Sequence, residues 1–175
     1  RVISSRAEAL NRFMGAYSRL AKMPDPVLKE VEVGPCVRRV VAMVTRLKVE
    51  LEEGPGLVIQ ADPDQLEQAL INLVRNAVDA SLETGGSVSM GWHQTGKELD
   101  VYILDEGKGL ADTTNLFVPF FTTKSGGSGI GLFLCRQIAE AHGGRVSLKN
   151  RTDGPGCEAH LLLPGARLSP ATRTL

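Results

Sequence analysis

The sequence is poor in cysteine and histidine. Only three of its 175 residues are cysteine and three are histidine. Cys36, Cys135 and Cys157 are far apart and form no CxxC pair, so a disulfide framework is not expected, and the isolated histidines do not suggest a zinc site. We expect reduced, apolar-packed cysteines in a reducing compartment, which favours a cytoplasmic location.

Net charge and long apolar runs are also lacking. The chain has 20 basic and 20 acidic residues, for a formal net charge of +0. It therefore offers no electrostatic argument for nucleic acid as a partner. No apolar run approaches the roughly 20 residues that cross a bilayer, and no signal peptide pattern opens the sequence. We expect one globular domain that is not embedded in a membrane.

Apolar periodicity predicts the secondary structure. Residues 1–22 are expected to form an amphipathic helix that ends at the prolines of "MPDP". The tail from 165 to 175 is expected to be frayed and flexible. The mixture of elements indicates an α+β fold, a two-layer α/β sandwich whose mixed, mostly antiparallel sheet is covered by helices on one face. The remaining expected elements are helices at 34–51, 63–84 and 129–144, and strands at 28–33, 57–61, 87–92, 98–107, 145–150 and 157–164, with 93–97 as the turn of a hairpin.

The helix expected at 63–84 contains "LINLVRNAVDAS". Asn72, Asn76 and Asp79 are poor helix formers, yet they lie within about 60° of each other on an otherwise largely apolar helix. Asparagines four residues apart suit a divalent cation and its phosphates, because the amide offers both a neutral oxygen ligand and a donor. A solvent-facing stripe is the alternative, and this helix alone does not decide between the two.

Two glycine clusters follow. "LDEGKGL" places Asp105 at the end of a strand before Gly107 and Gly109, where glycines allow close approach of a flat ligand; an ordinary aspartate turn is the alternative. "SGGSGIGLFLC" places Gly127, Gly129 and Gly131 around a helix start, where backbone N–H groups attract phosphate. This cluster follows a loop and not a strand, and no GxxxxGK[ST] occurs, so neither a dinucleotide fold nor a Walker A loop is favoured.

"FVPFFTTK" lies between these clusters. Its phenylalanines are expected to pin the base of a lid, whose Lys124 would reach a terminal phosphate. A loop simply held in place by aromatic residues is the alternative. Because the segment 107–129 is longer than most loops of compact domains, a functional role is favoured.

In this order and spacing the motifs resemble the ATP-binding catalytic domain of sensor histidine kinases, in the Bergerat-fold superfamily with the gyrase, Hsp90 and MutL clamps. The resemblance covers about 28–164. It implies ATP and Mg²⁺ as cofactors, with Asn76 as the Mg²⁺ ligand and Asn72 and Lys124 as catalytic residues. Asp105 would read the adenine amino group, and residues 110–128 would form the ATP lid. The other nucleotide-binding residues implied are Asp79, Gly107, Gly109, Thr122, Thr123, Gly127, Gly129, Gly131 and Leu132.

Position 72 bears on the reaction. In the hydrolysing clamps of the superfamily a glutamate orients water one turn before the metal-binding asparagine, and here that position is Asn72, which cannot act as a general base. We therefore expect transfer of the γ-phosphate to a protein. An ATP-hydrolysing clamp and a non-catalytic nucleotide-sensing module are the alternatives, and a serine-directed anti-sigma-factor kinase is a further, less favoured one.

The resemblance also implies partners. Residues 1–27 look like part of the dimerisation and phosphoacceptor hairpin with its linker, and the acceptor motif of the type His-Glu-x-x-Asn-Pro-Leu is not in this chain. His93, His142 and His160 fit structural roles better than the acceptor role. We expect a homodimeric parent protein that acts upstream of a response regulator in two-component signalling. A membrane anchor in that parent is compatible with this expectation. The chain alone should bind Mg·ATP without autophosphorylation.

Overall fold

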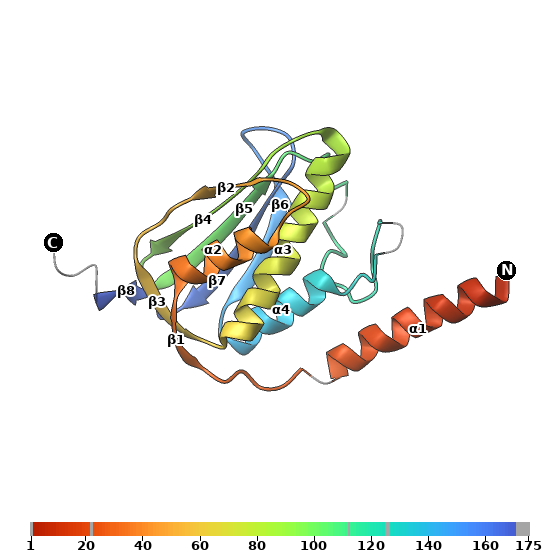
Figure 1. The fold of residues 1–175 in the computed structure, drawn as a ribbon, viewed down its shortest axis with the longest axis horizontal. Helices are drawn as coiled ribbons and strands as arrows, with labels where there is room; N and C mark the ends of the chain where they lie inside the picture. Colours follow the sequence, from red (N-terminus) through yellow and green to blue (C-terminus); the bar gives the residue numbers. More distant parts are fainter. Residues whose placement is uncertain (1, 22, 112, 125–126, 171–175) are drawn as a thin grey trace.

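A layer of helices covers one face of a five-stranded sheet in the computed structural model, which describes residues 2–21, 23–111, 113–124 and 127–170 (Figure 1). The strand order is β2-β4-β5-β7-β6, with β2 parallel to β4 and the other neighbours antiparallel. The predicted fold class is confirmed. The helices of the layer are α2 (Val33–Met43), α3 (Pro63–Thr84) and α4 (Gly131–Ala141), and the strands are β2 (Val49–Glu52), β4 (Val88–Thr95), β5 (Glu98–Asp105), β6 (Arg145–Asn150) and β7 (Cys157–Pro164).

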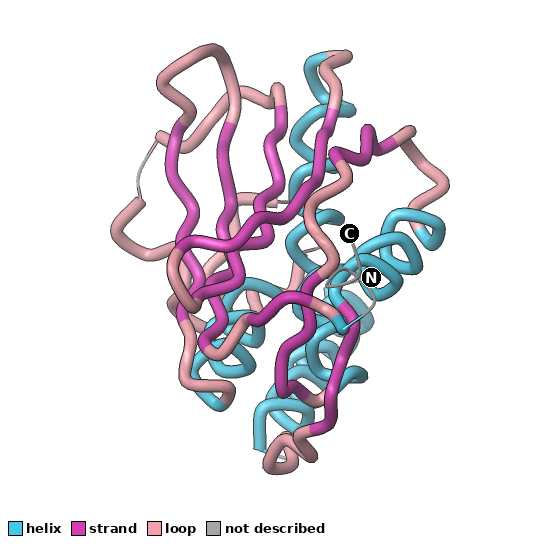
Figure 2. The backbone as a smooth tube through the Cα atoms, turned by 90° about the vertical axis from the view of Figure 1, so that its left-hand side faces the viewer, coloured by secondary structure: helices cyan, strands magenta, loops and turns pink. Residues whose placement is uncertain are grey.

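A second, smaller sheet has the order β1-β3-β8, and Figure 2 draws the strands of both sheets in magenta. It consists of β1 (Lys29–Glu32), β3 (Leu57–Ala61) and β8 (Arg167–Leu168), with both pairs antiparallel. The tail was expected to be frayed from residue 165, and this is wrong for its first part. Arg167 pairs with Val58 across the sheet, and the Ser169 N–H donates to the carbonyl of Gly56 at 2.9 Å. Residues 171–175 lie outside the described part.

The helix expected at 34–51 is also wrong in its second half. Helix α2 ends at Met43, Val44 is already extended, and β2 follows. Apolar residues at 44, 47 and 51 keep a helical spacing, but "VELE" also alternates. Its pairing with β4, in which Val49 lies opposite Val88, settles the choice because it buries Val49 in the core.

Glycine conformations shift two other predicted boundaries. The hairpin strands run on to Thr95 and start again at Glu98, so the turn is only Gly96 and Lys97 and not all of 93–97. Helix α4 starts at Gly131 and not at 129, because Gly129 has a φ of 68°, which a right-handed helix does not accept.

Local signals define α3. The Asp62 side chain accepts from the N–H groups of Asp64 and Gln65, Pro63 follows as the first residue, and Gly85 ends the helix at a φ of 72°. The apolar side of α3 forms much of the core between the helices and the sheet. Its buried residues are Gln65, Leu66, Ala69, Leu70, Leu73, Val74, Ala77, Val78 and Ser81.

Helix α1 (Val2–Ala21) extends away from the helix–sheet layers (Figure 1). Its described apolar side chains at 10, 13, 14 and 17 are all exposed, and the Phe13 ring lies 4.5 Å from that of Phe120, centroid to centroid. The linker after α1 is fastened to the start of α3. Gln65 Nε2 donates to the carbonyl of Pro24 at 2.9 Å, and the Val27 N–H donates to Asp62 Oδ2 at 2.9 Å. Within the described residues, no helix is both long and apolar enough to cross a membrane.

Candidate functional site

One stretch of α3 meets both glycine clusters and the FVPFFTTK segment that the sequence singled out. A Cβ on Gly131, at the start of α4, would lie 3.9 Å from Asn72 Cγ. Lys124 contacts α3 one turn further on, and a Cβ on Gly107, after β5, would lie 2.6 Å from the Cβ of Ala80. The stripe on α3 therefore faces Lys124 and the glycine at the start of α4, and it is not a solvent stripe.

Lys124 bridges two oxygens of this stripe. Its Nζ lies 3.3 Å from Asn76 Oδ1 and 3.1 Å from Asp79 Oδ2. The ammonium group is a stand-in cation, and its contacts show that an amide oxygen and a carboxylate oxygen converge on one positively charged group. The amide oxygen of Asn76 is a hard donor of the kind that Mg²⁺ accepts, so Asn76 fits the metal that the resemblance implies.

Arg46 is a residue that the sequence did not single out. It lies between α2 and β2, and its Nη1 donates to Asp79 Oδ1 at 2.6 Å. Partial burial opposes ionisation of Asp79, but hydrogen bonds and charge from Arg46 and Lys124 outweigh this and hold its pKa below the ordinary value. Because residues 44–48 were expected to be helical, no sequence signal directed this arginine to α3.

Asp105 is buried at the end of β5, at 5% exposure. Its Oδ1 accepts from the N–H groups of Gly107 at 2.9 Å and Cys157 at 3.1 Å. None of the hydrogen bonds found among the described residues uses Oδ2. Burial raises the pKa of Asp105, while the two N–H groups and the charge of Arg151 pull it down. A buried carboxylate whose second oxygen is not used in this way can accept from an exocyclic amine, and contact with the adenine amino group stays a prediction.

The glycines beside Asp105 allow close packing. Gly109 has a φ of 79°, and a Cβ there would lie 2.8 Å from Asn150 Oδ1. That same oxygen accepts from the Leu110 N–H at 2.6 Å, and Asn150 Nδ2 donates to the Leu110 carbonyl at 3.0 Å. Asn150 thus fastens the start of the lid. The sequence analysis missed it, because it lies at the end of β6, 40 residues away in the chain.

The other end of the lid is pinned by Phe120. Its N–H donates to the carbonyl of Gly129 at 2.9 Å, and its φ of 66° is unusual for a side-chain-bearing residue. A Cβ on Gly129 would lie 2.4 Å from the Phe120 carbonyl carbon, so only glycine fits there. Phe120 also packs, partly buried, against the core, so it holds this segment in place, and the role of the segment as a nucleotide lid stays a prediction.

The remaining predicted residues of the lid and of the α4 start differ in their surroundings. The Lys124 N–H donates to Thr122 Oγ1 at 3.1 Å, and a Cβ on Gly127 would lie 2.7 Å from that oxygen. Thr123 is exposed, and Leu132 packs partly buried against the core. Ile130 gives the first turn of α4 no side-chain cap, so that turn presents N–H groups of the kind that bind anions.

The three histidines have structural contacts. His142 Nε2 accepts from the Asp62 N–H at 3.0 Å, so its Nδ1 carries the proton donated to the Ile138 carbonyl at 2.7 Å. His160 and His93 both face Asp100. His160 Nδ1 lies 2.9 Å from Asp100 Oδ1, and His93 Nε2 lies 3.4 Å from Asp100 Oδ2. The three cysteines are free and buried, and burial raises their pKa values to about 11 or 12.

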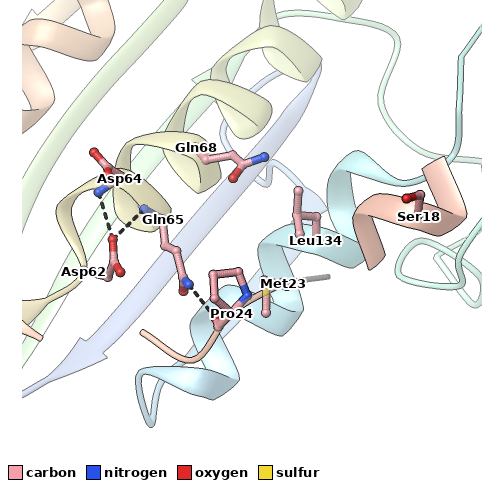
Figure 3. Close-up of a pocket in the computed structure, with 8 residues that line it drawn as sticks. All are labelled: Ser18, Met23, Pro24, Asp62, Asp64, Gln65, Gln68 and Leu134. Carbon is pink, nitrogen blue, oxygen red and sulfur yellow. Dashed lines mark hydrogen bonds between the residues drawn. The ribbon is translucent and has the colours of Figure 1, made fainter. Parts of the chain in front are cut away.

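A cavity of about 410 Å³ lies near the other end of α3, next to the linker (Figure 3). Gln65 projects there towards Pro24, and Gln68 lies one turn along the helix. Gln68 and Asn76 are eight residues apart, about 12 Å along an α-helix, so this cavity is separate from the Asn76 region. It is lined by Ser18, Met23, Pro24, Asp62, Asp64, Gln65, Gln68 and Leu134.

Comparison with known proteins agrees with this geometry. The family described as "Histidine kinase-, DNA gyrase B-, and HSP90-like ATPase" matches residues 61–167. The sensor histidine kinase ZraS of Escherichia coli K12 is 31% identical over 172 residues, which cover 93% of this chain and 37% of ZraS. The chain therefore spans little more than a third of that relative.

Solved structures give the same result. The catalytic domain of the histidine kinase ThkA has a TM-score of 0.69 at 27% identity, covering 79% of this chain and 95% of that domain. The mycobacterial sensor histidine kinase MprB has a TM-score of 0.69 at 28% identity, covering 79% of this chain and 98% of that one. The chain belongs to the histidine kinase-, gyrase B- and HSP90-like ATPase family, and within it is the ATP-binding catalytic domain of a sensor histidine kinase.

Proposed function

We propose that this domain binds Mg·ATP between α3 and the lid and that its parent protein transfers the γ-phosphate to a histidine on a dimerisation hairpin. The observation that carries the proposal is the Lys124 ammonium held by Asn76 and Asp79. It is a cation placed where the sequence predicts metal and phosphates to meet. The buried carboxylate of Asp105, with an unused oxygen, supports an adenine amino group as the other end of the ligand.

Asn76 would hold the Mg²⁺, which supplies neutralisation of the phosphate charge when bound. Lys124 would move from Asn76 to the terminal phosphate, and Asn72 would lie beside the phosphates near the start of α4. The phosphates would be lined by the N–H groups in the first turn of α4 and by glycines 127, 129 and 131. Thr122, Thr123 and Leu132 would complete the nucleotide contacts. These groups position and neutralise the triphosphate, which is most of what phosphoryl transfer requires.

Transfer, and not hydrolysis, is the reaction that Asn72 favours. An amide takes up no proton from water, and Asn72 lies beside Gly131 with its polar group near Cys135. Helix α1 would be the remaining half of the phosphoacceptor hairpin, because its exposed apolar face needs a helical partner. A response regulator would take the phosphate from that hairpin, in a homodimeric parent.

Calorimetric titration of the chain with ATP, with and without Mg²⁺, tests the binding half of the proposal. We expect saturable binding that Mg²⁺ strengthens. Labelled ATP should leave no acid-labile phosphate on the chain alone, but should label a histidine when the complete hairpin of the parent is added. Steady release of inorganic phosphate without any acceptor would instead identify a hydrolase, and ATP binding without transfer to the complete parent would identify a sensing module.

A further inference from the structure

We propose that Arg46 is a positioning residue, which shares the Asp79 carboxylate with Lys124 and so sets how readily the lid lysine leaves α3 for the phosphates. This inference rests on the proposed function, because it takes the terminal phosphate as the destination of Lys124. The two cations use different oxygens of one side chain. Arg46 Nη1 lies 2.6 Å from Asp79 Oδ1, and Lys124 Nζ lies 3.1 Å from Oδ2.

The two cations sit on connecting segments of different length. Arg46 lies between α2, whose Val40 is fully buried, and β2, whose Val49 is buried and paired with β4. Lys124 lies in the stretch between β5 and α4, where the described residues form neither helix nor strand. Because the short connection that carries Arg46 is tied to a buried residue on each side, we infer that Arg46 stays in place when the longer segment that carries Lys124 rearranges.

Asp79 carries one negative charge and faces two positive ones. With Arg46 present, both cations neutralise the Asp79 carboxylate. Lys124 can then leave Asp79 while Arg46 still balances the negative charge. Without Arg46, Lys124 is the main counter-ion of Asp79, so its departure costs more and leaves an unneutralised carboxylate beside the triphosphate. Both effects oppose nucleotide binding, and both act through Asp79. Arg46 thus weakens the lid contact without touching the nucleotide.

Two substitutions should therefore have opposite signs. In calorimetric titrations with saturating Mg²⁺, we expect Arg46→Gln to weaken ATP binding about two- to five-fold, the range that exposed ion pairs support. Asp79→Asn removes the lysine contact and the repulsive charge together, so it should strengthen binding by a similar factor. The double variant should match Asp79→Asn, because Arg46 then has nothing to act through.

Two further variants are controls. Arg46→Lys keeps the charge and should stay close to the unsubstituted chain. Arg38→Gln removes the Arg38–Glu53 pair at 2.8 Å, which is similarly exposed but does not touch Asp79, and should change nothing. Thermal unfolding of each variant shows that it is folded.

A second readout needs no nucleotide. Trypsin should cut after Lys124 more slowly in Arg46→Gln, where Asp79 holds the lysine more tightly, and faster in Asp79→Asn. Weakening by Arg46→Gln in the Asp79→Asn background would overturn the inference, because it would mean that Arg46 acts on the nucleotide directly. Equal trypsin rates in all variants would overturn it too. If the unsubstituted chain binds no ATP, the proposed function fails, and the trypsin rates still judge the Arg46–Asp79–Lys124 contact.

Discussion

The backbone carbonyl of Asp105 lies directly against Gly156. A Cβ on residue 156 would come within 2.0 Å of that carbonyl oxygen and 2.8 Å of the Asp105 Oδ1 atom. Gly156 also has a φ of 96°, in the region that side chains rarely adopt. The turn before β7 can therefore pack against the buried carboxylate only because residue 156 is a glycine.

Gly156→Ala should be strongly destabilising for this reason. We expect the free energy of unfolding to fall by about 2–4 kcal/mol, the combined effect of a forced clash and a strained φ. Gly154→Ala, in the same turn, is the matched control. A Cβ there meets only Arg151 Nη2, at 3.9 Å, so its effect should stay within about 0.5 kcal/mol. Urea denaturation measures both, and equal losses would contradict the assignment.

Asp105→Asn should separate stability from binding. The asparagine oxygen can still accept from the N–H groups of Gly107 and Cys157, so the fold is kept, but the amide cannot serve the adenine amino group as a carboxylate does. We expect ATP affinity to fall about tenfold or more, and discrimination between ATP and GTP to fall with it.

The same variant has a pH signature. The folded pKa of Asp105 is raised by burial above 3.8, so the native aspartate binds its proton more tightly than the unfolded one. Its contribution to stability is present below pH 3.8 and is lost as the pH rises through the folded pKa. Asparagine does not titrate. The melting temperature of Asp105→Asn relative to the unsubstituted chain should therefore increase as the pH is raised, and parallel curves would contradict the burial argument.

Asn76→Ala tests the metal assignment. Without the amide oxygen, the gain in ATP affinity on adding Mg²⁺ should largely disappear, while the affinity measured in EDTA should change little. Gln68→Ala, two turns earlier on α3 and exposed, should keep the full Mg²⁺ effect. If Asn76→Ala kept the full response to Mg²⁺, residues other than Asn76 would have to hold the metal.

His160→Gln tests a histidine whose pKa is raised in the fold. A hydrogen bond to Asp100 raises it above 6.5, and burial opposes this. Protonated His160 therefore stabilises the fold below pH 6.5, and this contribution is lost as the pH rises through the folded pKa. The unsubstituted chain should exceed the variant in melting temperature most at about pH 6 and least at about pH 9. A gap that does not depend on pH would show that His160 acts by packing alone.

The part of the site that could be predicted consists of residues whose neighbours in the sequence make them recognisable. Helix α3 has an aspartate cap, a proline start and a glycine end, and Asn72, Asn76 and Asp79 stand out on it because they oppose helix propensity. Asp105 stands out because it ends an apolar strand before two glycines. Such features depend on neighbours within a few residues, so a single sequence displays them.

The unpredictable part depends on contacts between distant segments. Arg46 and Asp79 are 33 residues apart, and Asn150 and Leu110 are 40 apart. The strand character of β2 and β8 appears only through pairing with β4 and β3, since four- and two-residue strands carry almost no pattern of their own. For the same reason Gly156 could not be distinguished from the other turn glycines before Asp105 was placed against it.

The amino-acid order alone thus determined most of the elements, both ends of α3 and the identity of the polar groups, because caps, periodicity and propensity act over short distances in the chain. Tertiary structure alone decided that the lid lysine rests on Asn76 and Asp79, that Arg46 shares that carboxylate, and that the turn before β7 closes on Asp105. Those relationships arise when separate segments are brought together by burial of one apolar core, and no local stretch of the chain encodes them.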